Sequence, residues 1–166
     1  MLLEEDNQLS LDDLENLIPK DHLCHFVESV VNQIDCPEEN AAFIDRNSDT
    51  GYSCKLLLRL ILMSIFDGGL SDHEIERRTN TNIFYMYLAR METPCFKTIA
   101  KFKSNFHDLI FETFKRSIEL ADEDVLIKIH QFIDNPNIEM KSYELDDELK
   151  ILNQNLNESI EVDKKY

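Results

Sequence analysis

The sequence has only three glycines, and no run of it alternates cleanly between apolar and polar residues. Such alternation is typical of a half-buried strand, whereas apolar residues three and four apart indicate an amphipathic helix. The apolar residues of this chain recur at helical spacing almost throughout. With 43% hydrophobic residues the chain can also bury a core. The sequence therefore predicts an all-α fold, with a compact multi-helix domain followed by an acidic C-terminal helix or tail.

The chain also lacks a hydrophobic run of about 20 residues, the length that a membrane-spanning helix needs. The run over residues 56–66 is shorter than this and is interrupted by Arg59. Residues 1–20 are acidic and have no basic start, so they do not look like a secretory signal peptide. We therefore expect a soluble cytoplasmic protein with no membrane partner.

Cysteine pairs with CxxC spacing, an HExxH motif and a glycine-rich phosphate loop are all missing. These patterns carry structural zinc, zinc-protease and nucleotide-binding sites. His22, Cys24 and His25 lie close together on a predicted helix and could hold a metal, but no second ligand pair stands nearby. Reduced thiols in a cytosolic protein account better for the cysteines. We therefore predict no metal site and no cofactor.

Basic residues are scarce, and the net charge is -16. A charge of this sign disfavours nucleic acids and anionic membranes as partners. The distribution is uneven, however. Residues 1–51 carry 13 acidic and two basic residues, 52–116 carry seven and ten, and 117–166 carry 13 and five. The mildly basic centre allows a local nucleic-acid site that the total charge hides.

Capping residues and apolar spacing predict a series of helices. Ser53 precedes the most apolar one, which we expect over 54–66 and which Gly68-Gly69 ends. Ser71 begins the Ser-x-x-Glu pattern of a capping box at the start of the next helix. Further helices are expected over 11–17, 21–34, 37–45, 79–90, 96–103 and 105–121.

Residues 122–166 differ in texture from the helices before them. VLIKIHQFID, 125–134, is β-branched and apolar, and it fits a strand or a helix. SYELDDELKILNQNLNESIEV, 142–162, has apolar residues at helical spacing on an acidic background. We therefore divide the chain into an acidic N-terminal segment (1–16), a helical domain (17–121) and a divergent tail with a remnant strand and an acidic amphipathic helix.

The best candidate for DNA binding is PCFKTIAKFKSNF, 94–106. A helix-turn-helix element lays one helix in the major groove and needs a basic, polar outward face. The inward face of this segment would carry Phe96, Ile99, Phe102 and Phe106. The outward face would carry Lys97, Thr98, Lys101 and Ser104, with Lys103 at its flank. Such lysines can contact successive phosphates, and a threonine can touch a phosphate or a base edge; the alternative is the solvated face of a core helix.

Arg77 and Arg78 form a second candidate. They end the helix that begins after Ser71, and cations stabilise a helix C-terminus by opposing its dipole. That structural role explains them as well as a phosphate-binding role does. Asp134, after the apolar run IHQFID, could hold a metal ion at a strand end. A single carboxylate makes no two-metal nuclease site, and a turn-forming aspartate before Asn-Pro is the simpler interpretation.

The order of these segments resembles the N-terminal, InsH-type domain of prokaryotic insertion-sequence transposases of the DDE class. Four segments carry the resemblance, which covers roughly residues 17 to 121. They are LIPKDHLCHFVESVVNQID (17–35), GYSCKLLLRLILMSIFDGGLSDHEIERR (51–78), NIFYMYLA (82–89) and PCFKTIAKFKSNFHDLIFETF (94–114).

The resemblance implies a helical DNA-binding region ahead of an RNase H-like catalytic domain. In the intact family enzyme an Asp-Asp-Glu triad holds two divalent metals, such as Mg²⁺, for strand cleavage and transfer. Here Asp134 stands where the first triad residue is expected, but NPNIEMK follows it in place of the family's GTKI. Cys95-Phe96 and Phe102-Lys103 also depart from the family's Asp-His and Phe-Arg.

These departures lead us to expect a truncated, non-enzymatic transposase-like protein that binds insertion-element ends. Its DNA-binding residues would be Arg77, Arg78, Lys97, Thr98, Lys101 and Lys103. The alternative is an interaction protein that pairs with itself or with a full-length transposase through its acidic tail. A residual metal nuclease built on Asp134 is the third hypothesis.

Overall fold

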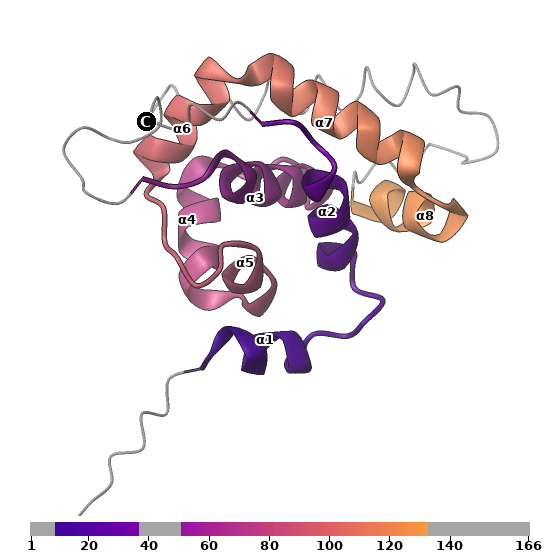
Figure 1. Ribbon diagram of the computed structural model, residues 1–166, viewed down its shortest axis with the longest axis horizontal. Helices are drawn as coiled ribbons and strands as arrows, with labels where there is room; N and C mark the ends of the chain where they lie inside the picture. The colour runs from indigo at the N-terminus through magenta and orange to yellow at the C-terminus, as the bar shows by residue number, and fades with distance from the viewer. Residues whose placement is uncertain (1–8, 37–50, 133–166) are drawn as a thin grey trace, which may run out of the picture.

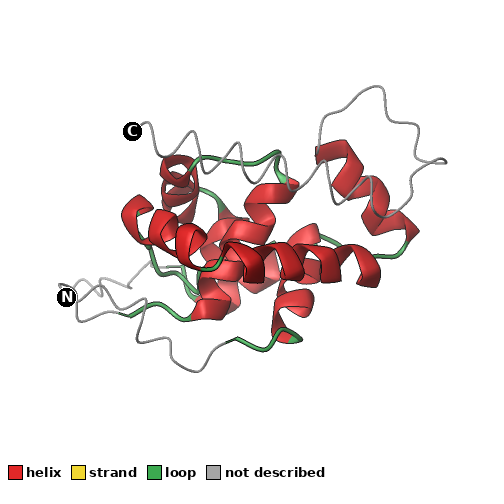
Figure 2. Ribbon diagram, turned by 90° about the horizontal axis from the view of Figure 1, so that it is seen from above, coloured by secondary structure: helices red, strands yellow, loops and turns green. Residues whose placement is uncertain are grey.

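The computed structural model describes residues 9–36 and 51–132, and every regular element within these ranges is an α-helix (Figures 1 and 2). The expected all-α fold is therefore confirmed. The helices are α1 (Leu11–Leu17), α2 (Leu23–Asn32), α3 (Cys54–Phe66), α4 (Asp72–Thr81), α5 (Ile83–Leu88), α6 (Phe96–Asn105), α7 (His107–Leu120) and α8 (Glu123–Phe132). None of them is long and apolar enough to cross a membrane.

Helix α3 is the centre of the fold, and α2, α5 and α7 pack against it (Figure 1). It has the predicted bounds, and the hydroxyl of Ser53 accepts a hydrogen bond from the backbone N–H of Leu56 at 3.1 Å. Every α3 residue except Lys55 is buried. A helix that is apolar on all sides is stable only when other helices cover all of them.

Gly68 and Gly69 end α3 and turn the chain towards α4. Their φ angles are 97° and 80°, in the left-handed region where a Cβ atom costs energy, so this turn requires glycine. Gly69 donates its N–H to the Ser64 carbonyl at 2.9 Å, which satisfies one of the last α3 carbonyls. The predicted stop signal is confirmed.

The break between α4 and α5 lies later than the sequence indicated. A single helix was expected over 79–90, but α4 continues to Thr81 and α5 begins at Ile83. The side chain of Asn82 accepts hydrogen bonds from the N–H groups of Phe84 and Tyr85, and it thereby caps α5. Asparagine is a favoured N-cap because its short side chain reaches these donors.

Helix α8 replaces the strand that we assigned to the tail, so the remnant-strand prediction is wrong for residues 125–132. Asp122 explains the outcome: its carboxylate accepts the N–H of Val125 at 2.8 Å, and its carbonyl accepts the N–H of Leu126. A capped start favours a helix over a strand even in a β-branched segment. Asp134 and the helices expected over 37–45 and 142–162 lie outside the described residues.

Helix α1 joins the core instead of standing apart from it. Leu14 and Ile18 are both buried, and α1 packs against α5. Ser10 and Asp13 form a reciprocal capping box at its start, with side-chain to backbone distances of 3.1 and 2.9 Å. A domain boundary drawn at residue 16 would cut through this helix.

Candidate nucleic-acid interface

Helix α6 separates apolar and polar residues as the sequence indicated. Ile99 and Phe102 are buried, whereas Lys97 and Lys101 are exposed and Thr98 is half-buried. Lys97 and Lys101 are four residues apart, so they lie one helical turn from each other on the same face. Among the described residues neither lysine forms an ion pair. Lys97, Thr98 and Lys101 are called the α6 face below.

Helix α6 is held against α4 at two places. The rings of Phe96 and His73 stack with centroids 3.9 Å apart, near the start of α6. Close to its end, the ammonium of Lys103 lies 2.6 Å from the carboxylate of Asp72, the first residue of α4. His73 and Arg77 are four apart on α4 and share a face. The stack therefore brings the start of α6 close to the face that bears Arg77.

Lys103 does not lie at the flank of a DNA-binding face, and this prediction is wrong. The residue is only 1% exposed, as is its partner Asp72. A buried ion pair of this kind has no contact with solvent, so the lysine cannot reach a phosphate in this fold. The spacing of apolar residues could have predicted this burial, because position 103 is four residues after Ile99 and one after Phe102, on the apolar side of α6.

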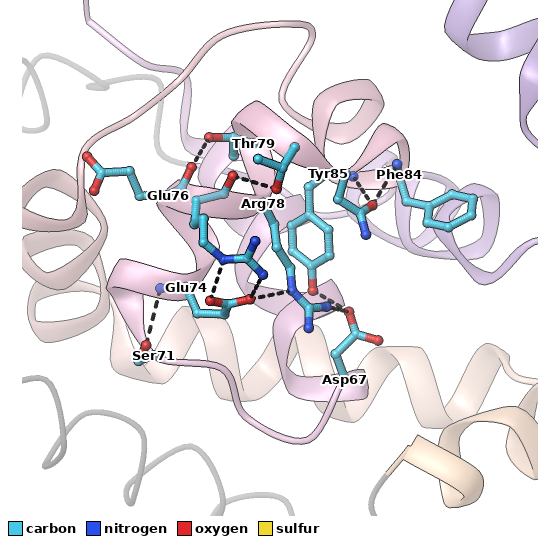
Figure 3. A network of polar contacts seen from close by, with 11 residues as sticks. Asp67, Ser71, Glu74, Glu76, Arg78, Thr79, Phe84 and Tyr85 are labelled. Carbon is cyan, nitrogen blue, oxygen red and sulfur yellow. Dashed lines mark hydrogen bonds and ion pairs between the residues drawn. The ribbon is translucent and has the colours of Figure 1, made fainter.

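Arg77 and Arg78 converge on a single carboxylate, that of Glu74 (Figure 3). Arg77 binds it with two nitrogens, yet its side chain remains 61% exposed. Arg78 also reaches Asp67 at 3.2 Å, and its guanidinium lies 5.5 Å from the ring centroid of Tyr85. Arg77 is therefore accessible to a ligand, whereas Arg78 links α4 to the end of α3 and to α5.

The same network explains why only one of the two hydrogen bonds of the capping box at Ser71 forms. The Ser71 hydroxyl accepts the N–H of Glu74 at 3.2 Å, but the Glu74 carboxylate turns to the two arginines (Figure 3). Behind it, Tyr85 donates its hydroxyl to Asp67. Burial raises the pKa of the Asp67 carboxyl, against the lowering effects of Tyr85 and Arg78.

Replacing Glu74 with glutamine should lower stability slightly at neutral pH and have no effect in strong acid. The hydrogen bond from Arg77, with help from Arg78, lowers the pKa of Glu74 from 4.5 to about 2. A carboxyl whose pKa is depressed by folding stabilises the protein above its unfolded pKa and loses this effect as pH falls to its folded pKa. The loss should not exceed about 1 kcal/mol, because the pair is partly exposed.

The measurement is urea unfolding of wild type and Glu74→Gln at pH 7, 4.5, 3 and 2. The difference in unfolding free energy should shrink between pH 4.5 and 2. A difference that stayed constant over this range would show that Glu74 acts by packing and not by charge. Glu112→Gln, an exposed carboxylate on α7, is the matched control.

Two other cations of the basic centre, Arg59 and Arg90, are used inside the fold. Arg59, which interrupts the apolar run, is buried, and its Nε donates to the Leu88 carbonyl at 2.8 Å. Burial lowers the pKa of Arg59 to about 10. Arg90 forms an ion pair with Glu28 and lies over the ring of Tyr87. The surface that remains basic is therefore smaller than the net charge of residues 52–116 suggests.

His22, at the start of α2, has structural partners, and Cys24 is buried. His22 caps α2 by accepting the N–H of Cys24 at 3.0 Å, and its ring stacks on Phe84 with centroids 3.6 Å apart. Burial raises the pKa of the Cys24 thiol to about 12. Within residues 9–36 and 51–132, no three His, Cys, Asp or Glu side chains gather in a way that could hold a metal ion.

A cleft of about 610 Å³ lies between the start of α2 and the start of α8. Its charged lining residues are Lys20 and Asp21 on the α2 side and Asp122 and Asp124 on the α8 side, and His25 adds an imidazole. Phe26 and Val125 add apolar surface. This mixture has no basic character, so the cleft does not extend the α6 face.

The family described as Transposase domain (DUF772) matches residues 12–105. The chain belongs to this transposase-domain family. No curated protein and no solved structure matches the chain significantly. The matched range starts at the second residue of α1 and ends at the last residue of α6, so it covers both α4 and the α6 face.

Helix α7 lies outside the matched range and packs against helices within it. Ile110, Phe114 and Ile118 of this helix are buried, and α7 packs against α2 and α3. Phe114 meets Phe66 of α3 edge to face, with ring centroids 5.7 Å apart. Family membership connects the chain with transposition, and the exposed lysines and Arg77 are its described basic features near α4 and α6.

Proposed function

We propose that this transposase domain binds DNA through the α6 face, with Arg77 of α4 at its edge. Helices α4 and α6 would act as a helix-turn-helix-like pair, in which α6 enters the major groove. The observation that carries the proposal is the exposure of Lys97 and Lys101, one turn apart on a helix that two contacts hold against α4. Thr98 would contribute a hydroxyl to a phosphate or a base.

Binding of this kind should be weak and sensitive to salt. Two lysines and one arginine offer about three phosphate contacts, and each contact adds about -0.9 to the slope of log affinity against log salt. The acidic residues elsewhere in the chain oppose binding over longer distances, and salt screens them. Two of the six predicted DNA-binding residues, Arg78 and Lys103, are left out of this interface because the fold uses them internally.

Replacing Lys97 and Lys101 together with alanine should reduce DNA affinity at least about tenfold at low salt and flatten the salt slope by about 2. Fluorescence anisotropy with labelled duplexes measures both quantities, using ends of insertion elements from the same family and random duplexes. Thr98→Val should act mainly on the preference between the two kinds of duplex. Addition of EDTA should change nothing, because we propose no metal at this interface.

Lys20→Ala is the matched control, since it removes an exposed lysine from the α1–α2 connection, away from α6 (Figure 1). An equal loss of DNA affinity in this variant would mean that binding depends only on the total charge of the protein. An unchanged salt slope in the double variant would exclude the α6 face. Circular dichroism should confirm that the variants stay folded, because both α6 lysines are exposed.

We assign the described helices a binding role and not a catalytic one. The chemistry of a DDE transposase depends on carboxylates that hold two metal ions, and the only candidate we identified, Asp134, lies outside the described residues. Mg²⁺-dependent nicking of element ends that Asp134→Asn abolished would contradict this assignment.

A second proposed function is pairing with another copy or with an intact transposase of the family. The use of Arg59, Arg78, Arg90 and Lys103 inside the fold favours it, because few cations then remain for phosphates. Light scattering and pull-down with the intact relative test it. Pairing through the acidic tail should be lost in a Leu149→Asp, Leu152→Asp variant, whereas the DNA-binding proposal expects these changes to leave affinity intact.

A further inference from the structure

Cys36 and Cys54 meet where the end of α2 comes beside the start of α3. Cys36 packs against the core to which Cys54 belongs, where the two thiols are hydrogen-bonding neighbours. Cys54 is the first residue of α3 and is fully buried, while Cys36 is half-buried and packs against the core. Both are free thiols in this structure. Two thiols in contact and separated by 17 residues of sequence are the prerequisite for a disulfide.

An independent contact holds the backbone at the same place. The ammonium of Lys55 donates to the carbonyl of Asn32, the last residue of α2, at 3.2 Å. Ile34 packs against the core between this contact and Cys36. The close approach of the two cysteines therefore follows from the packing of α2 on α3 and does not depend on the thiols alone.

We propose that Cys36 and Cys54 form a redox-active pair, which a hydroperoxide oxidises to an intramolecular disulfide and a small thiol reduces again. In the first step the Cys36 sulfur attacks a peroxide oxygen, the O–O bond breaks, and sulfenic acid and one water form. In the second step the Cys54 thiol attacks the sulfenic sulfur, and the hydroxyl leaves with the thiol proton as a second water. Two thiols are oxidised and one hydrogen peroxide is reduced to two waters.

Access sets the order of the steps. The half-buried Cys36 can meet a peroxide, whereas Cys54 is enclosed by the core. Burial, with a contribution from Cys36, raises the pKa of the Cys54 thiol, so it is a poor first nucleophile. It is nevertheless in place as the resolving thiol, because it already touches Cys36.

The other two cysteines have different surroundings. Cys24 is buried within α2. Cys95 is exposed at the start of α6, and its sulfur lies 3.4 Å from the hydroxyl of Thr98. Cys95 will therefore compete for the oxidant and can join two molecules. The experiment uses the full chain carrying Cys95→Ser as the background, and the unaltered chain beside it.

The disulfide would link Cys36 to Cys54 in the unfolded chain as well as in the folded one. Such a cross-link raises the melting temperature by restricting the unfolded state, and a loop of this size predicts a rise of about 5–10 °C. The α6 face does not contain either cysteine, so affinity for DNA should stay unchanged. This inference therefore stands apart from the proposed function.

Titration with hydrogen peroxide should produce a species 2 Da lighter, which loses two alkylatable thiols and recovers them with dithiothreitol. Trypsin should then release peptide 21–46 linked to peptide 47–55. Because peptide 21–46 also contains Cys24, the same link must persist in Cys24→Ser and vanish in Cys36→Ser. The 2 Da loss of mass and the rise of about 5–10 °C in melting temperature should both be absent in Cys36→Ser and in Cys54→Ala.

In the unaltered chain, peroxide is added to the folded protein and the thiols are alkylated after denaturation. The proposal is overturned if Cys36 and Cys54 are both still free when Cys95 has been modified. A link that disappears in Cys24→Ser would assign the partner of Cys54 to Cys24 and would also overturn it. Oxidation of Cys36 to stable sulfinic acid without a disulfide would show that Cys54 does not resolve it, with the same conclusion. Cys36→Ser keeps a small polar side chain at a half-buried position, so loss of folding does not obscure the result.

Discussion

Replacing Asp72 with asparagine will lower the free energy of unfolding by about 3–5 kcal/mol. Its carboxylate lies 2.6 Å from the ammonium of Lys103, and each residue is only 1% exposed. Removing one partner leaves a buried positive charge without compensation, which costs far more than an exposed pair contributes. Urea unfolding at pH 7, followed by circular dichroism, measures the loss.

Two further variants separate the ion pair from simple packing. Replacing both partners by apolar residues, as Asp72→Leu with Lys103→Met, should recover most of the lost stability, since no charge is then buried. Asp108→Asn, an exposed carboxylate at the start of α7, should change stability by less than about 0.5 kcal/mol. A loss in the double variant as large as in Asp72→Asn would mean that the pair's shape and not its charge holds α4 to α6.

Replacing Phe66 with alanine will cost about 3–5 kcal/mol of unfolding free energy. Phe66 is fully buried at the end of α3, and its ring meets that of Phe114 from α7 edge to face. The substitution removes the buried ring and leaves a cavity that the surrounding helices fill only in part. Thermal and urea unfolding both measure the loss.

A double-mutant cycle tests whether α7 is an integral part of the transposase domain. Phe114→Ala should cost a similar amount, and the two losses together should be smaller than their sum because the rings contact each other. Phe111→Ala, a half-buried phenylalanine on the same helix, should cost less. If Phe114→Ala proved neutral, α7 would be a dispensable addition to the α1–α6 unit that the family match covers.

The starts and ends of helices were largely predictable because they depend on neighbouring residues. Ser53, the Gly68-Gly69 turn and Ser71 each act on backbone groups within a few positions. Asn82 shows the limit of this approach. Asn80 and Thr81 are also residue types that can cap a helix, so the local sequence does not single out Asn82, which caps α5 in the structure.

The candidate interface was predictable in part for the same reason. The exposure of Lys97 and Lys101 follows from the apolar spacing of α6, which is a local property. The partners of Lys103 and Arg78 are not local, since Asp72 and Asp67 lie 31 and 11 residues before them. Spacing could place Lys103 on the apolar side of α6, but it could not supply the carboxylate that makes burial there possible.

The sequence by itself therefore determined the helical class, the capped helix starts, the apolar α3 and a polar face on α6. These follow from periodicity and from hydrogen bonds between near neighbours. Only the tertiary structure decided which cations remain at the surface, that Lys103 is buried, and that Cys36 touches Cys54. Those outcomes depend on contacts between helices that are distant in sequence, because a charge or a thiol acquires its surroundings only when the helices pack.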